Sequence, residues 1–146
     1  MKKIILNIFL FIILSSCGYS PILTQNIKDF NIEIQSIKGD SIINNSILSR
    51  LNRIKNDQSK NKIIINIDTK YNKIINSKDA TGATLSYELN VTSNFDVNQK
   101  NINQKFVITE KFLMDKFDNK FDEDSYERTI KKTFASSIAQ KIILKL

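Results

Sequence analysis

The stretch ATLSYELNVTSNFDV, residues 83–97, carries the clearest pattern in the chain. Its odd positions from Ala83 to Val97 are apolar except for Ser93, and its even positions are polar throughout. Alternation of this kind predicts a β-strand with one face in a core and the other in solvent. We expect a strand of about 14 residues, a length that predicts a bend or bulge.

Three further segments alternate in the same way on either side of this strand. A turn is predicted at 98–101, and a second long strand follows over 102–114, where Val107 and Leu113 interrupt the polar positions. Upstream, two more strands are predicted, one before a break at Gly39-Asp40 and one before the polar connection 76–79. Their apolar positions are Phe30, Ile32 and Ile34 in the first and Ile63, Ile65, Ile67 and Tyr71 in the second.

Two segments have a helical period instead. Ser41 is the expected N-cap of the first helix, whose apolar face consists of Ile43, Ile47, Leu48, Leu51 and Ile54. The second helix repeats an apolar residue every four positions, at Tyr126, Ile130, Phe134, Ile138 and Ile142. Acidic residues complement the positive end of a helix dipole, and this is the role expected for Asp122, Glu123 and Asp124.

The predicted order of elements is therefore β-α-β-β-β-α. Two amphipathic helices can cover one face of a four-stranded sheet, so we expect an α+β fold, a two-layer sandwich with both helices on the same face. The other sheet face would be open and polar, carrying side chains such as Asn66, Asn90, Thr92 and Thr109. Such a face is either simply solvated or a contact surface for a partner.

The composition excludes several classes of protein. The 146 residues include no His, one Cys and three Gly, which rules out a Ser-His-Asp triad, a disulfide framework, a Cys-cluster metal site and a Gly-rich phosphate loop. The formal net charge is +7, but 19 of the basic residues are Lys and only 3 are Arg. Because Arg is the residue suited to bidentate phosphate recognition, we expect no nucleic-acid partner. We also expect no cofactor and no metal.

An acidic run is the one feature that suggests hydrolysis. A glycosidase needs two carboxylates at a set separation across a cleft. Capping of the last helix is the simpler interpretation of the run, so we expect a protein that is not an enzyme. The residues concerned are Asp115, Asp118, Asp122, Glu123 and Asp124.

The N-terminus has the pattern of a bacterial lipoprotein signal. Lys2 and Lys3 precede an apolar run over 4–14, which at about 11 residues is shorter than the ~20 needed to cross a bilayer. Leu14-Ser15-Ser16 then precedes Cys17, the only cysteine. We expect 1–16 to be removed as a signal peptide and Cys17 to carry acyl chains, of which two or three give a stable anchor.

The expected location follows from this signal. Gly18 follows the cysteine where an Asp would favour the inner membrane, so we expect an outer-membrane anchor with the domain on the periplasmic face. Residues 17–29 would form the lipidated tether, and 30–146 a single domain, a size that suits one module.

The start of the mature chain, Cys17-Gly18-Tyr19-Ser20-Pro21-Ile22-Leu23, resembles the LPS-assembly lipoprotein family (LptE). The strand at 83–89, the pair Ser125-Tyr126 and the last helix fit the same family in the same order. The resemblance implies a plug inside a β-barrel LPS translocon of the LptD type, assisting barrel assembly and binding lipopolysaccharide. No basic motif of the family aligns with this chain. Lys70, Lys73 and Lys78, clustered near one strand connection, are the candidates for contact with anionic lipid head groups and hence with lipopolysaccharide.

A second hypothesis retains the lipid anchor at Cys17 but assigns the domain a different function. The chain would be a periplasmic chaperone that carries a lipid or a lipoprotein, and it would need an enclosed apolar cavity instead of a filled core. A third, a periplasmic hydrolase, would need two converging carboxylates in a deep cleft.

Overall fold

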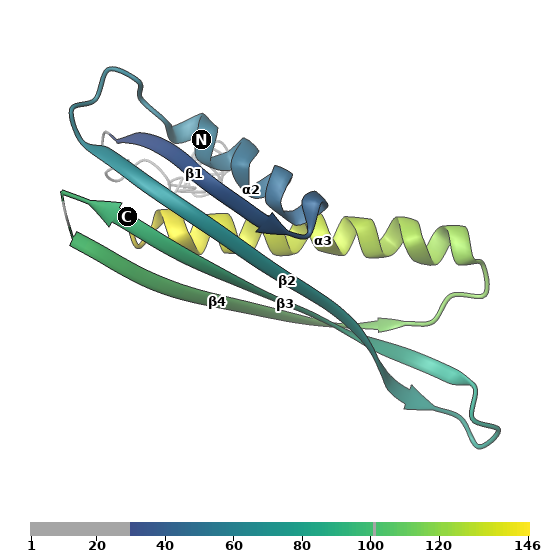
Figure 1. Ribbon diagram of the computed structural model, residues 1–146. Helices are drawn as coiled ribbons and strands as arrows, with labels where there is room; N and C mark the ends of the chain where they lie inside the picture. Colours follow the sequence, from purple (N-terminus) through teal and green to yellow (C-terminus); the bar gives the residue numbers. More distant parts are fainter. Residues whose placement is uncertain (1–29, 101) are drawn as a thin grey trace, which may run out of the picture.

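The structure is a computed structural model that describes residues 30–100 and 102–146. The predicted signal peptide 1–16, the acylation site Cys17 and the tether 17–29 lie outside the described residues. The elements follow the predicted order and confirm the α+β fold (Figure 1). They are β1 (Asn31–Gly39), α2 (Ser41–Ile54), β2 (Lys62–Lys78), β3 (Thr84–Gln99), β4 (Ile102–Asp115) and α3 (Lys120–Ile143).

The sheet has the strand order β1-β2-β3-β4. β2, β3 and β4 form an antiparallel meander, whereas β1 pairs parallel to β2 because α2 carries the chain back between them. Both helices lie on one side of the sheet, with α3 running along its length (Figure 1). This is the two-layer arrangement expected from the sequence.

The core lies between the two layers and follows the predicted parity. The inward side chains of β3 are each at most 4% exposed, namely Leu89, Val91, Phe95 and Val97. Those of β2 are equally buried, namely Ile63, Ile65 and Ile67. The helices contribute Ile43, Ile47 and Leu51 from α2 and Ile138 and Ile142 from α3, all fully buried. Removal of this apolar surface from water, at about 25 cal/mol per Å², is the main stabilising term.

The helix caps differ from the prediction by one residue in α2. Asp40 is the N-cap of α2, where its side chain accepts a hydrogen bond from the Ile43 amide at 3.0 Å, so the prediction of Ser41 was wrong. Either residue suits a cap, and sequence alone does not rank them. Asn119 caps α3, and Asp122 and Glu123 lie in its first turn as predicted.

The bulge was expected in β3 or β4, but those strands pair in unbroken register from Ser86↔Asp115 to Gln99↔Ile102. The irregularities lie in the pairing of β1 with β2 and at the end of β2, between Ile75 and Lys78. β2 also extends into the predicted connection 76–79 and ends at Lys78. Side chains of Ser77 and Asn76 there hydrogen-bond to the Ser86 hydroxyl at 2.6 and 3.0 Å.

Leu85 consequently departs from the core pattern of β3. It is 51% exposed, although its parity predicted burial. The end of the β2–β3 ribbon turns away from α3 at this point (Figure 1), so no helix covers it. The turn itself is built around Asp79, whose carboxylate accepts hydrogen bonds from the amides of Thr81 and Ala83 at 2.8 and 2.9 Å.

Two glycines with positive φ allow a matched test of close backbone packing. Gly39 and Gly82 have φ values of +95° and +88°, a region that favours glycine. A Cβ at Gly39 would also overlap the backbone carbonyl of Thr69, whereas a Cβ at Gly82 meets nothing within 4 Å. We expect Gly39→Ala to lower the free energy of unfolding by more than about 3 kcal/mol and Gly82→Ala by about 1 kcal/mol. Urea denaturation of both variants measures this, and equal losses would contradict the close packing assigned to Gly39.

Candidate functional site

The three lysines predicted to bind anionic head groups do not form one patch. Lys70 is exposed on the open face of the sheet, and Lys78 is exposed at the end of β2. Lys73 lies an odd number of residues from Lys70 in a regular part of β2, so its side chain points to the opposite, helix-covered face. Lipopolysaccharide binding by these residues stays a prediction.

Lys73 is the centre of a largely buried ionic cluster between β2 and α3. Its Nζ lies 2.8 Å from Glu123 Oε1 and 2.9 Å from Glu127 Oε2. The Tyr71 hydroxyl donates a hydrogen bond to Glu127 Oε1 at 2.9 Å, and the Lys73 ammonium lies 4.2 Å from the centroid of the Tyr87 ring. Side-chain exposure is 19% for Lys73 and 4% for Glu123. The cluster therefore ties the N-terminal half of α3 to the sheet.

The members of this cluster hold one another in their charged forms. The hydrogen bond from Lys73 lowers the pKa of Glu123 to about 2, against the effect of burial. Burial by itself would raise the pKa of Glu127 and lower that of Lys73, but their mutual hydrogen bonds and charges reverse both shifts. Burial and the neighbouring Glu127 raise the pKa of the Tyr71 hydroxyl. At neutral pH this is a satisfied ion-pair network, without a carboxyl poised for proton transfer.

A second ion pair extends the network to α2. Lys131 Nζ lies 2.8 Å from Asp40 Oδ2 and 3.9 Å from the centroid of the Tyr71 ring. Asp40 also caps α2, so one carboxylate joins the start of α2 to the middle of α3. The sequence contains the signal for these contacts, since Glu123, Glu127 and Lys131 recur every four residues on one side of α3.

Two acids of the acidic run form ion pairs with lysines. Glu123 pairs with Lys73, and Asp124 accepts a hydrogen bond from Lys120 at 2.6 Å. Within residues 30–100 and 102–146 we find no group of three or more Asp, Glu, His or Cys side chains placed to hold a metal ion. Over the same residues no helix is both long enough and apolar enough to cross a membrane.

The open face of the sheet is polar, as predicted, and its side chains are paired across the strands. The Thr92 and Thr109 hydroxyls lie 3.2 Å apart, and the Ser36 hydroxyl donates to Asn66 Oδ1 at 2.7 Å. A shallow hollow of about 420 Å³ lies on this face, and Asn66, Asp68, Asn94, Asp96 and Lys105 are among its lining residues. Val107 and Leu113 add two apolar side chains that are 66% and 61% exposed. This surface offers amide and hydroxyl groups suited to contact with another polar surface.

Solved structures share this fold. No protein-family model and no curated protein matches the sequence. Rare lipoprotein B from Shewanella oneidensis is similar with a TM-score of 0.59 and 14% identity, over 81% of this chain and 96% of that one. A minor lipoprotein from Acinetobacter baumannii gives a TM-score of 0.55 at 12% identity, over 82% and 94% of the two chains. Lipoprotein B from Nitrosomonas europaea gives 0.53 at 17% identity, over 83% and 86%.

Removal of one carboxylate charge from the ionic cluster tests its contribution to stability. Glu123→Gln leaves Lys73 largely buried with one partner fewer, and we expect a loss of about 3 kcal/mol in the free energy of unfolding at pH 7. Asp124→Asn is the matched control in the same helical turn. Its ion pair with Lys120 is exposed, so the loss should be below about 1 kcal/mol. Equal losses in urea denaturation would contradict the role of the cluster.

The same variant tests the pH dependence. The folded protein holds the pKa of Glu123 at about 2, below its ordinary value of 4.5. The stabilisation is therefore complete above about pH 4.5 and declines as the pH falls toward 2. We expect Glu123→Gln to flatten the stability curve in that window. A slope identical to that of the unmodified protein would show that Glu123 does not titrate there.

Proposed function

We propose that this chain is a non-enzymatic lipoprotein of the LPS-assembly lipoprotein family, anchored in the outer membrane through acyl chains on Cys17. Its domain stands on the periplasmic side, assists assembly of an LptD-type barrel and takes part in inserting lipopolysaccharide. The observation that carries the proposal is the coincidence of a lipoprotein-type signal at 1–17 with a fold found in solved bacterial lipoproteins.

The packing supports an assembly role over a carrier role. A protein that carries a lipid needs an enclosed apolar cavity, but the space between sheet and helices is filled by large side chains such as Phe95, Leu89 and Ile138. Hollows of about 210, 420 and 550 Å³ are open to solvent, beside the β3–β4 hairpin, on the open sheet face and along β4. Polar hydroxyl and amide groups on the open face suit the water-filled inside of a barrel partner.

The described residues also support a role without catalysis. Glu123 and Asp124 pair with lysines, and the pKa of Glu123 is lowered instead of raised toward neutrality. A general acid or base would require the opposite shift.

The proposal is tested in three steps on the full chain. Mass spectrometry should find acyl chains on Cys17, and the protein should fractionate with outer membranes. Affinity purification from native membranes should recover a β-barrel protein, and depletion of the chain should reduce lipopolysaccharide at the surface. An unmodified Cys17 would contradict the anchor, whereas an acylated chain without a barrel partner and with normal surface lipopolysaccharide would contradict the assembly role.

A charge placed on the open sheet face tests whether that face meets the partner. The double variant Thr92→Glu and Thr109→Glu puts two carboxylates on exposed, neighbouring positions and should reduce recovery of the barrel by about tenfold or more. Thr129→Glu with Thr133→Glu, on exposed positions of α3, is the matched control and should leave recovery unchanged. If the two pairs behave alike, the open face is not the contact surface.

A further inference from the structure

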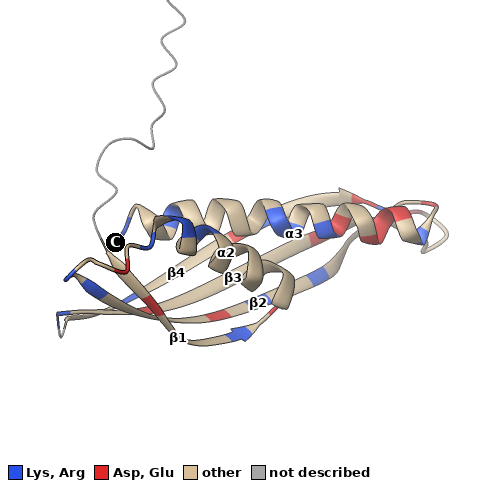
Figure 2. Cartoon of the chain, turned by 90° about the horizontal axis from the view of Figure 1, so that it is seen from above, with Lys and Arg blue, Asp and Glu red and all other residues tan. Residues whose placement is uncertain are grey.

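Charge is distributed unevenly along the long axis of the molecule. Figure 2 shows basic residues gathered at the end that holds the C-terminus, and acidic residues at the opposite end of α3. Residues 115–124 at that far end contain five acids and two lysines.

Seven basic residues make up what we call the basic end. They come from three separate parts of the chain that the fold brings to one end (Figure 1). These parts are the end of α2 with the loop and the first residue of β2 that follow it, the β3–β4 hairpin, and the end of α3. All seven are exposed. Among them, Lys55 forms an ion pair with Asp57 at 2.7 Å and Lys62 pairs with Glu33. The seven residues are Arg50, Arg53, Lys55, Lys60, Lys62, Lys100 and Lys145.

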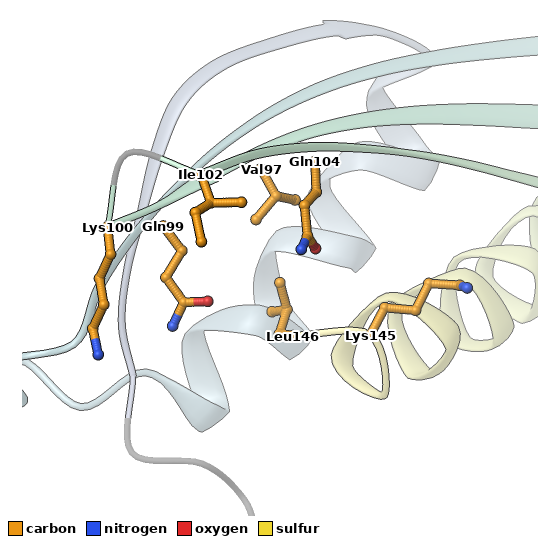
Figure 3. A pocket seen from close by; sticks show the side chains of 7 residues that line it. All are labelled: Val97, Gln99, Lys100, Ile102, Gln104, Lys145 and Leu146. Carbon is orange, nitrogen blue, oxygen red and sulfur yellow. The ribbon is translucent and has the colours of Figure 1, made fainter.

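Apolar side chains are exposed among these charges. Ile102 in the hairpin is 62% exposed, and Leu144 at the end of α3 is 75% exposed. A pocket of about 210 Å³ lies between the hairpin and the end of α3, with Lys100 and Lys145 among its lining residues (Figure 3). Basic residues beside exposed apolar ones are the combination that binds the interface of an anionic membrane.

The chain also enters the domain at this end. Phe30, the first described residue, forms a bridge with Lys55, and its carbonyl accepts a hydrogen bond from the Asn56 amide at 2.8 Å. Cys17 precedes Phe30 by 13 residues, which span at most about 45 Å when fully extended. An anchor at Cys17 would therefore keep the basic end within about 45 Å of the bilayer surface.

We propose that, before the domain enters a barrel partner, its basic end docks on the surface of a phospholipid bilayer with anionic head groups. Docking sets the domain upright, with its acidic end away from the membrane. The orientation rests on the proposed anchor at Cys17. Each lysine near such a surface contributes about a fivefold preference for the docked state, which salt screens. The surface is distinct from Lys70, Lys73 and Lys78, none of which belongs to the basic end.

A single tryptophan can report the docking, because the chain contains none of its own. Ile102→Trp and Leu113→Trp replace side chains of similar exposure, 62% and 61%, on the same strand. The two positions are 11 residues and so about 37 Å apart. The acylated full chain is reconstituted into vesicles containing brominated lipid, with phosphatidylglycerol or with phosphatidylcholine alone. We expect quenching of Ile102→Trp on phosphatidylglycerol vesicles at low salt, and none for Leu113→Trp.

Charge reversal identifies the residues responsible. In the Ile102→Trp background, Lys60→Glu, Lys100→Glu and Lys145→Glu together should lower the ratio of docked to undocked protein by at least about a hundredfold and abolish quenching. The control reverses Lys38, Lys116 and Lys132, which are also exposed and lie outside the basic end, and it changes the net charge by the same amount. It should leave quenching unchanged. Equal quenching of the two tryptophans would overturn the proposal, and so would loss of quenching in the control variant.

Flotation of the vesicles separates this proposal from the anchor. A chain that floats with both kinds of vesicle without quenching of Ile102→Trp is anchored but not docked, which overturns the docking alone. A chain that floats only with phosphatidylglycerol vesicles docks without an anchor, which contradicts the proposed acylation. A chain that floats with neither contradicts both.

Discussion

The removal of one face of a four-stranded sheet from water is the constraint on which the other features depend. Once α2 and α3 cover that face, every second side chain of β2, β3 and β4 must point outward, where a polar residue is compatible with solvent. Most inward positions are apolar, and the buried hydroxyls of Thr69 and Ser93 hydrogen-bond to each other at 2.9 Å. Tyr71, Lys73 and Glu110 also point inward and require partners. Glu127, Glu123, Ser137 and Lys141 of α3 supply them. Polar and charged side chains of α3 therefore pair with the polar groups on the inner face of the sheet.

The two halves of α3 contact the rest of the fold in different ways. Its C-terminal half contributes Phe134, Ile138 and Ile142 to the core, whereas its N-terminal half contacts β2 through charges. Because a largely buried charge without a partner is costly, the polar half specifies where the helix sits along the sheet more than it adds to stability.

The sequence predicts this architecture well because its signals are local. Alternation in β3 from Leu89 to Val97 and the four-residue repeat from Ile130 to Ile142 depend on neighbouring residues alone. The sequence-based predictions are wrong where tertiary contacts determine whether a side chain is buried. Leu85 is exposed because the ribbon leaves the helix layer, which no property of residues 83–89 shows. Proximity in sequence groups Lys73 with Lys70, although the strand parity of Lys73 and the spacing of Glu123 and Glu127 indicate the inner face. The basic end could not be predicted, since residues 53, 100 and 145 meet only in the fold.

The parallel pairing of β1 with β2 has a consequence for how the chain folds. The β2–β3–β4 meander closes through two short hairpins, so its contacts are near in sequence and form at little cost in chain entropy. β1 can pair only after α2 has returned the chain across the sheet, and it lies at the sheet edge with one neighbour. We therefore expect the meander to form early and β1 to join late, leaving the segment next to the N-terminal tether as the last part of the sheet to become ordered.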